Sequence, residues 1–124
     1  MQLVFADSEV ARVLVQGRTL QLQFAAAAVE PSAAGGEPGY LLGLVLELQG
    51  ARWTGEPSTC FGRLREGSLA EAATRFTRLE LPFDGPGPWI GEFAFVTGAQ
   101  LVVHAERASA LLGRGERFRA SFAC

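Results

Sequence analysis

The sequence contains no lysine and no asparagine. Its eleven basic side chains are therefore all arginine, and thirteen acidic side chains bring the net charge to −2. Because the codons for lysine and asparagine are rich in A and T, their absence beside abundant alanine, glycine and arginine indicates a GC-rich genome, which we expect to be bacterial. A chain without a basic surplus lacks the charge that nucleic-acid binding needs, so we expect no nucleic-acid partner.

Histidine and cysteine, which supply most ligands of protein-bound zinc, are scarce. His104 is the one histidine, and the two cysteines, Cys60 and Cys124, are far apart and have no C-x-x-C spacing. One histidine excludes a site built from several imidazoles, so we expect no metal and no cofactor. Two interpretations of the cysteines stay open. Either Cys60 is a small buried hydrophobe and Cys124 lies at a frayed terminus, or the two form a disulfide.

Long hydrophobic runs are also missing. The stretch from Tyr40 to Leu48 is too short to cross a bilayer and carries Glu47. The first residues have neither the basic region nor the long apolar region of a secretion signal. We therefore expect a cytoplasmic protein with no membrane partner.

The sequence is rich in the alternation that is typical of β-strands. Large apolar residues recur at every second position after Leu20, around Leu44 and around Phe93, and a period of two puts neighbouring side chains on opposite faces of a strand. The apolar share of 48 % is ample for the core of one domain. The sequence thus predicts a single all-β domain over residues 1–124, an antiparallel β-sandwich or flattened β-barrel of about eight strands with at most one short helix. The predicted core residues are Leu20, Leu22, Phe24, Leu44, Leu46, Phe93, Phe95 and Phe122.

Glycines and prolines predict where the strands are joined. Gly17 and Arg18 fit the tight turn of a first hairpin, and Thr97 with Gly98 fits a second one. The proline-rich and glycine-rich residues 84–88 predict an exposed loop. Between residues 66 and 77 we favour a hairpin turn at 66–67, with one short helical turn over 68–75 as the alternative.

Residues 40–49 predict one long strand with apolar side chains on both faces. Leucines at every even position from 42 to 48 form one face, and Leu41, Gly43 and Val45 form the other. One of these faces must meet the core, whereas the other is too apolar to stay in water. We expect a second copy of the chain to cover it, which predicts a homodimer.

The candidate contact residues are of two kinds. Three aromatic residues lie at junctions between loops and strands, where they either plug the end of the core or form an interaction surface. Two pairs of arginines each share one strand face, and two such strands side by side would bind a carboxylate or phosphate, although a solvated outer face is the simpler interpretation. The predicted surface consists of Tyr40, Trp53, Arg63, Arg65, Trp89, Arg117 and Arg119.

No set of residues forms a recognisable catalytic, phosphate-binding or dinucleotide-binding motif. Cys60, His104 and Asp84 supply the residue types of a thiol catalyst, but nothing near Cys60 in the sequence would activate its thiol. The first hypothesis is therefore a non-enzymatic protein-interaction module, with a protein partner besides a second copy of itself. The second is a β-barrel that binds a small apolar ligand, and an enzyme with an unrecognised site ranks last. Small residues predicted to line the interior of such a barrel are Ala26, Ala28, Gly43, Ala94 and Ala105.

Overall fold

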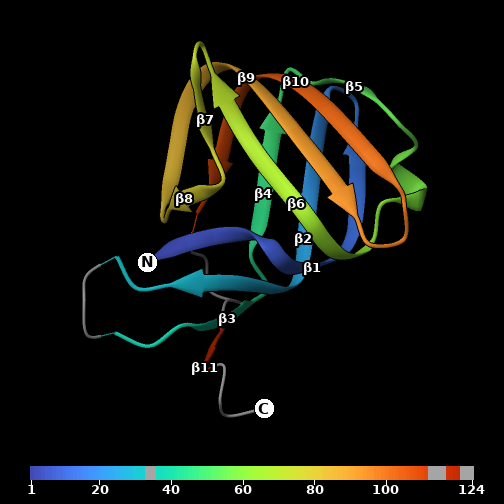
Figure 1. The fold of residues 1–124 in the computed structure, drawn as a ribbon. Coiled ribbons are helices and arrows are strands. Elements are labelled where there is room, and N and C mark those ends of the chain that lie inside the picture. The colour runs from blue at the N-terminus through green and yellow to red at the C-terminus, as the bar shows by residue number, and fades with distance from the viewer. Residues whose placement is uncertain (33–35, 112–116, 121–124) are drawn as a thin grey trace.

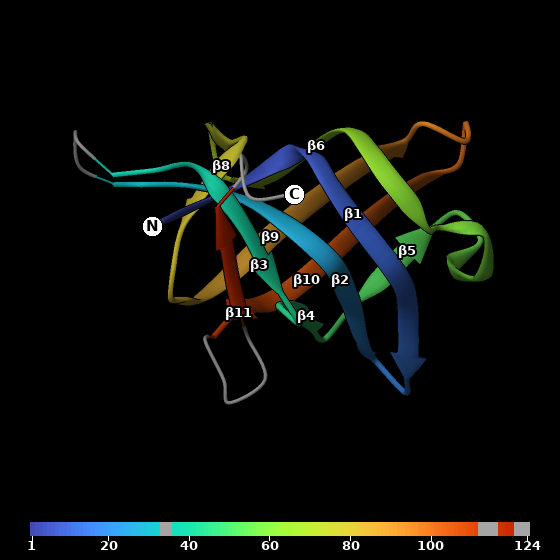
Figure 2. The same ribbon diagram turned by 90° about the horizontal axis from the view of Figure 1, so that it is seen from below.

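The chain folds into a closed antiparallel β-barrel, seen from the side in Figure 1 and from below in Figure 2. The computed structural model describes residues 1–32, 36–111 and 117–120. In this part of the chain there is no α-helix, and the only helical element is the 3-10 turn η1 (Pro57–Thr59). The strands are β1 (Gln2–Gln16), β2 (Thr19–Glu30), β3 (Gly39–Leu42), β4 (Val45–Gln49), β5 (Arg52–Thr54), β6 (Gly62–Glu71), β7 (Thr74–Phe76), β8 (Arg78–Glu80), β9 (Phe83–Phe95), β10 (Gln100–Ala110) and β11 (Arg117–Ala120).

Six strands form the ring of the barrel, in the order β1, β2, β4, β10, β9, β6 and back to β1. The two predicted hairpins are confirmed, because Gln16 pairs with Thr19 across one turn and β9 pairs with β10 across the other. The remaining strands lie outside this ring: β3 pairs with β2, β5 with β10, β7 with β6, and β8 with β1, and β11 pairs in turn with β3. The prediction of an all-β fold is confirmed, and of its two forms the chain adopts the barrel.

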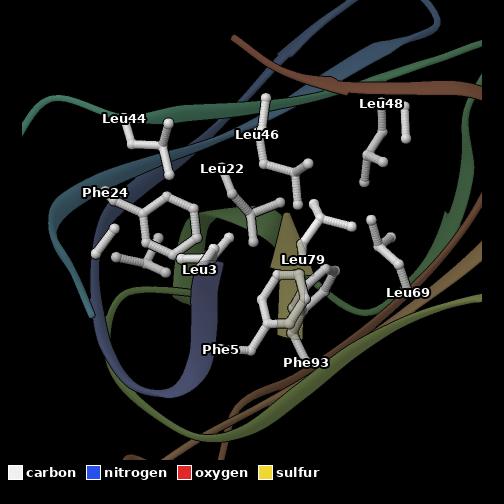
Figure 3. Packing of buried hydrophobic residues seen from close by; sticks show 14 of the residues in the cluster. Leu3, Phe5, Leu22, Phe24, Leu44, Leu46, Leu48, Leu69, Leu79 and Phe93 are labelled. Carbon is white, nitrogen blue, oxygen red and sulfur yellow. The ribbon is translucent and has the colours of Figure 1, made fainter. Parts of the chain in front are cut away.

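Large aliphatic and aromatic side chains fill the interior of the barrel (Figure 3). The rings of Phe5 and Phe93 meet edge to face, with their centroids 5.9 Å apart. Of the eight predicted core residues, seven are buried, and Phe122 lies outside the described residues. Leu46 and Leu48 of β4, together with Leu44 just before it, point toward the same interior as the leucines of β2.

The inner face of β2 changes at Ala25, which corrects the predicted position of two alanines. Val10 pairs with Phe24, but the preceding Glu9 pairs with Ala26, so Ala25 is an extra residue in the ladder. Such a bulge moves every later side chain to the opposite face. Ala26 and Ala28 are therefore only half-buried, and the buried residues beyond the bulge are Ala27 and Val29.

The predicted long strand over residues 40–49 is in fact two strands, and this prediction was wrong. Gly43, at φ +85°, separates β3 from β4. The break puts Leu41 on the inner side together with the later leucines, while Leu42 and Val45 are half-buried. The outer face of this segment thus carries fewer apolar side chains than the alternation suggested.

The predicted hairpin turn at 66–67 was also wrong, and so was the helical alternative over 68–75. Strand β6 runs straight through Gly67, and the chain turns at Ala72 and Ala73, where Ala72 has φ +52°. Gly67 serves close packing, since a Cβ there would lie 2.9 Å from the Cβ of Phe5 and 3.2 Å from Cδ1 of Phe93. This glycine makes room for aromatic rings within a strand.

Residues 84–88 form part of β9, which corrects the predicted loop. Strand β9 pairs with β10 from Phe83 onward. Its other neighbour, β6, pairs only with the second part of β9, from Ile90 to Phe95. The first part of β9 therefore lies at an edge of the sheet, and edges tolerate prolines because a missing N–H costs no ladder hydrogen bond there.

Candidate functional site

Two of the three aromatic candidates pack with the core. Trp89 is 5 % exposed, donates its indole N–H to the carbonyl oxygen of Gly85 at 3.1 Å, and packs edge to face against Phe83. Trp53 is half-buried on β5 and packs against the core, and Tyr40 is half-buried on β3. Trp53 and Trp89 thus plug the interior, which was the simpler of the two interpretations.

The sheet does not bring the two arginine pairs together. Arg63 and Arg65 are exposed on β6, which lies between β9 and β1, and Arg63 forms an ion pair with Asp7 at 3.1 Å. Arg117 and Arg119 lie on β11, whose partner is β3. Their side chains lie outside the described residues. Because β6 and β11 are not neighbours, strand pairing creates no four-arginine cluster.

Two of the three residues considered for a thiol catalyst, Asp84 and His104, are likewise separated. Cys60 is buried, and burial raises the pKa of its thiol, which donates to the carbonyl oxygen of Glu56. Asp84 forms an ion pair with Arg107 at 2.8 Å. Asp84 lies opposite Ser109 in the register, five positions along β10 from His104, or about 17 Å at the rise of a strand.

His104 instead belongs to a row of side chains that crosses four strands on the outside of the barrel. Ala70 on β6 pairs with Ile90 on β9, Ile90 pairs with His104 on β10, and His104 pairs with Arg52 on β5. Directly paired residues point to the same face of a sheet. Figure 1 looks onto this side of the barrel, where β6, β9 and β10 run side by side.

This row forms the floor of an open groove of about 610 Å³. We call it the cross-strand groove and define it by Ala70, Ile90, His104 and Arg52 with Arg18 and Glu106 at its rim. Its centre is apolar, since Ile90 is 38 % exposed and Ala70 lies beside it. One end carries hydrogen-bond donors, so the groove has an apolar part and a polar part.

Glu106 and Arg18 form a loose ion pair at the rim of the cross-strand groove. Their closest charged atoms are 3.9 Å apart, and both side chains are well exposed, so water screens the attraction between them. The bare backbone of Gly50, at φ +60°, leaves the space that the carboxylate of Glu106 fills, because a Cβ there would collide with it. Gly50 therefore leaves room for this negative charge beside the groove.

Sequence reasoning missed most of this groove. Of the residues that line it, only Trp89 was predicted as a contact residue and His104 considered as a catalytic one. Ile90, Arg52, Arg18 and Glu106 were not predicted as contact residues, because long-range register brings them together. One signal was present in the sequence. Ile90 lies on the same face of its strand as the exposed Glu92, whereas the buried Trp89 and Phe93 lie on the opposite face. An isoleucine on the polar face of a strand is a candidate contact residue.

No protein-family model, curated protein or solved structure matches this chain. The cross-strand groove must therefore be interpreted from its own chemistry. Across the described ranges, no three or more His, Cys, Asp and Glu side chains gather where they could hold a metal ion. None of the helices in the described segments is long and apolar enough to span a membrane.

Proposed function

We propose that this chain is a non-enzymatic protein-interaction module, from a GC-rich bacterium, that contacts its partner through the cross-strand groove. The observation that carries the proposal is the row across four strands, which has an exposed isoleucine in its apolar part and charged side chains at one end and at the rim. Protein interfaces share this arrangement of an apolar centre within a polar rim. The groove is formed by strands of the barrel and by its tight turns, so little ordering is needed on binding.

The alternative, a barrel that binds a small apolar ligand inside, receives less support. Of the five small residues predicted to line the interior, Ala94 and Ala105 are buried, but Ala26 and Ala28 are only half-buried on the outer face and Gly43 is exposed. Leucine and phenylalanine side chains occupy the space instead (Figure 3). The cross-strand groove is an accessible concave surface that combines apolar and polar groups, and it lies on the outside of the barrel.

Photo-crosslinking at the centre of the groove tests the proposal. The chain carries benzoylphenylalanine in place of Ile90 and is irradiated in an extract of the source bacterium. The control carries the same group in place of Val96, which is 61 % exposed in the turn at the far end of β9. We expect a discrete protein adduct from the Ile90 probe and none of that mass from the Val96 probe.

Competition shows whether the adduct depends on the groove. An excess of unlabelled wild-type chain, or of its V96E variant, is expected to suppress the adduct at least tenfold. The I90E variant is expected to leave it in place, because a carboxylate at the apolar centre removes the contact. Equal adducts from both probes, or equal suppression by I90E and wild type, would contradict the proposal.

A further inference from the structure

We propose that the partner presents an extended segment to the cross-strand groove, with an apolar residue over Ile90 and, two positions away in the segment, a carboxylate between His104 and Arg52. This inference rests on the proposed function and specifies its partner. Three features of the groove support it: the unused donors at one end, the apolar centre, and the distance between them.

Arg52 and His104 are hydrogen-bond donors that the described chain does not use. They are directly paired across β10 and β5, and both are exposed. Neither side chain forms an ion pair or side-chain hydrogen bond with a described residue, whereas Arg63, Arg78 and Arg107 each face a carboxylate. A guanidinium offers five N–H donors and no acceptor, so the group it fits best is an oxyanion.

Glu106 limits how much negative charge the groove accepts. Its carboxylate lies on the same strand as His104, two positions along, and the loose pair with Arg18 leaves it largely uncompensated. A run of phosphates would meet this charge, and the chain as a whole carries −2. A single carboxylate on the same segment as an apolar side chain can reach the donors Arg52 and His104 while it stays away from Glu106. This charge pattern favours an acidic protein segment over a nucleic acid or an anionic membrane surface.

The spacing of the strands sets the spacing of the motif. Neighbouring strands lie about 4.8 Å apart, so the midpoint between His104 and Arg52 is about 7 Å from Ile90 across the sheet. In an extended segment, residues two positions apart are also separated by about 7 Å. The segment therefore crosses the strands, with its apolar residue and its acidic residue two positions apart.

Synthetic peptides test the inference directly. The probe is a fluorescein-labelled nonapeptide with Leu-Ser-Glu at its centre and glycine and serine elsewhere, followed by fluorescence anisotropy. Control peptides replace the glutamate by glutamine, replace the leucine by serine, or place leucine and glutamate side by side. We expect the Leu-Ser-Glu peptide to bind at least tenfold more tightly than each control.

Matched arginine variants locate the carboxylate. R52Q is expected to bind the glutamate and glutamine peptides equally, because the donor that distinguishes them is gone. R65Q, which removes another exposed arginine outside the groove, is expected to keep the tenfold difference. Thermal unfolding of both variants checks that each is folded.

Several results would overturn the inference. They are equal binding of the glutamate and glutamine peptides by the wild type, equal losses in R52Q and R65Q, or no peptide binding at the highest soluble concentration. Binding of oligo-dT or of phosphatidylglycerol vesicles that is lost in R52Q would assign the groove to another class of partner and overturn it as well. If R52Q still suppresses the Ile90 adduct as well as wild type does, the acidic segment fails while the groove remains the proposed interface.

Discussion

Gly67 and Gly91 show how single residues without a side chain determine the packing of the core. Both lie beside the ring of Phe93: Gly67 is its cross-strand partner, and Gly91 precedes it by two positions on the same face of β9. A Cβ at Gly91 would lie 2.8 Å from Cε2 of Phe93. Interiors pack too densely to absorb such an addition without displacement. The rings of Phe5 and Phe93 meet because these two positions are empty.

Replacing Gly67 by alanine is expected to destabilise the fold by about 1–3 kcal/mol, because the added methyl group overpacks a filled site. The free energy of unfolding in urea measures the change. Gly85→Ala is the matched control, since its Cβ would find ordinary contacts of 3.6 and 3.7 Å with aromatic rings. G85A is expected to stay within about 1 kcal/mol of the wild type. Equal losses in the two variants would show that Gly67 is not a close-packing site.

For single residues, the sequence predicted which side chains of the regular strands are buried. Leu20, Leu22 and Phe24 are buried as their alternation indicated. Gly67 could not be interpreted correctly, because a glycine is equally suited to a turn and to a strand that needs space for a ring. Only the position of Phe5, far away in the sequence, distinguishes the two.

At the scale of elements, the hairpins with local signals were predicted and the irregular strands were not. Gly17 and Gly98 mark their turns in the sequence, and both have positive φ. The kinked N-terminal part of β1 has no comparable signal. There the buried hydroxyl of Ser8 donates to the carbonyl oxygen of Val4 at 2.6 Å and accepts the N–H of Ala28 at 2.8 Å. A side chain thus replaces ladder hydrogen bonds, and alternation alone cannot indicate this.

The turn between β6 and β7 gives a prediction for one element. Ala72 has a left-handed backbone at φ +52°, which costs a residue with a Cβ about 1–2 kcal/mol. Ala72→Gly removes that cost and adds some entropy to the unfolded chain, so we expect a net gain of about 0.5–1 kcal/mol in unfolding free energy. Ala73→Gly has no such strain to relieve and is expected to lose stability. Urea unfolding of both variants checks the turn, and a loss of stability in A72G would contradict it.

At the scale of the whole molecule, the closure of the barrel depends on pairings between distant segments. Glu9 pairs with Arg63, and Leu48 pairs with Ala108, and no local pattern indicates either partner. The sequence therefore left sandwich and barrel open. The same distant pairings assemble the cross-strand groove, which explains why the fold class could be predicted while the site could not.

The homodimer stays a prediction. The outer apolar surface that suggested it is smaller than the sequence indicated, because Leu41 faces inward. The outer side of β4 carries the half-buried Val45 and also Glu47, which accepts hydrogen bonds from Gln21 and Gln49. If a second copy covers this face, Val45→Arg is expected to separate the dimer without loss of β-sheet circular dichroism. Sedimentation equilibrium measures the mass. A wild-type monomer at high concentration would contradict the dimer.

The central claim is that binding takes place on the outside of a filled barrel, and one methyl resonance tests it most directly. Ile90 is the only isoleucine of the chain, so selective labelling of isoleucine δ1-methyl groups gives one NMR signal, which needs no assignment. With leucine methyls labelled as well, the chain is titrated with the Leu-Ser-Glu nonapeptide. We predict that the Ile90 methyl signal shifts in a saturable way while the signals of Leu22 and Leu46, inside the barrel, stay in place. A constant Ile90 signal, or shifts confined to the interior leucines, would contradict the account.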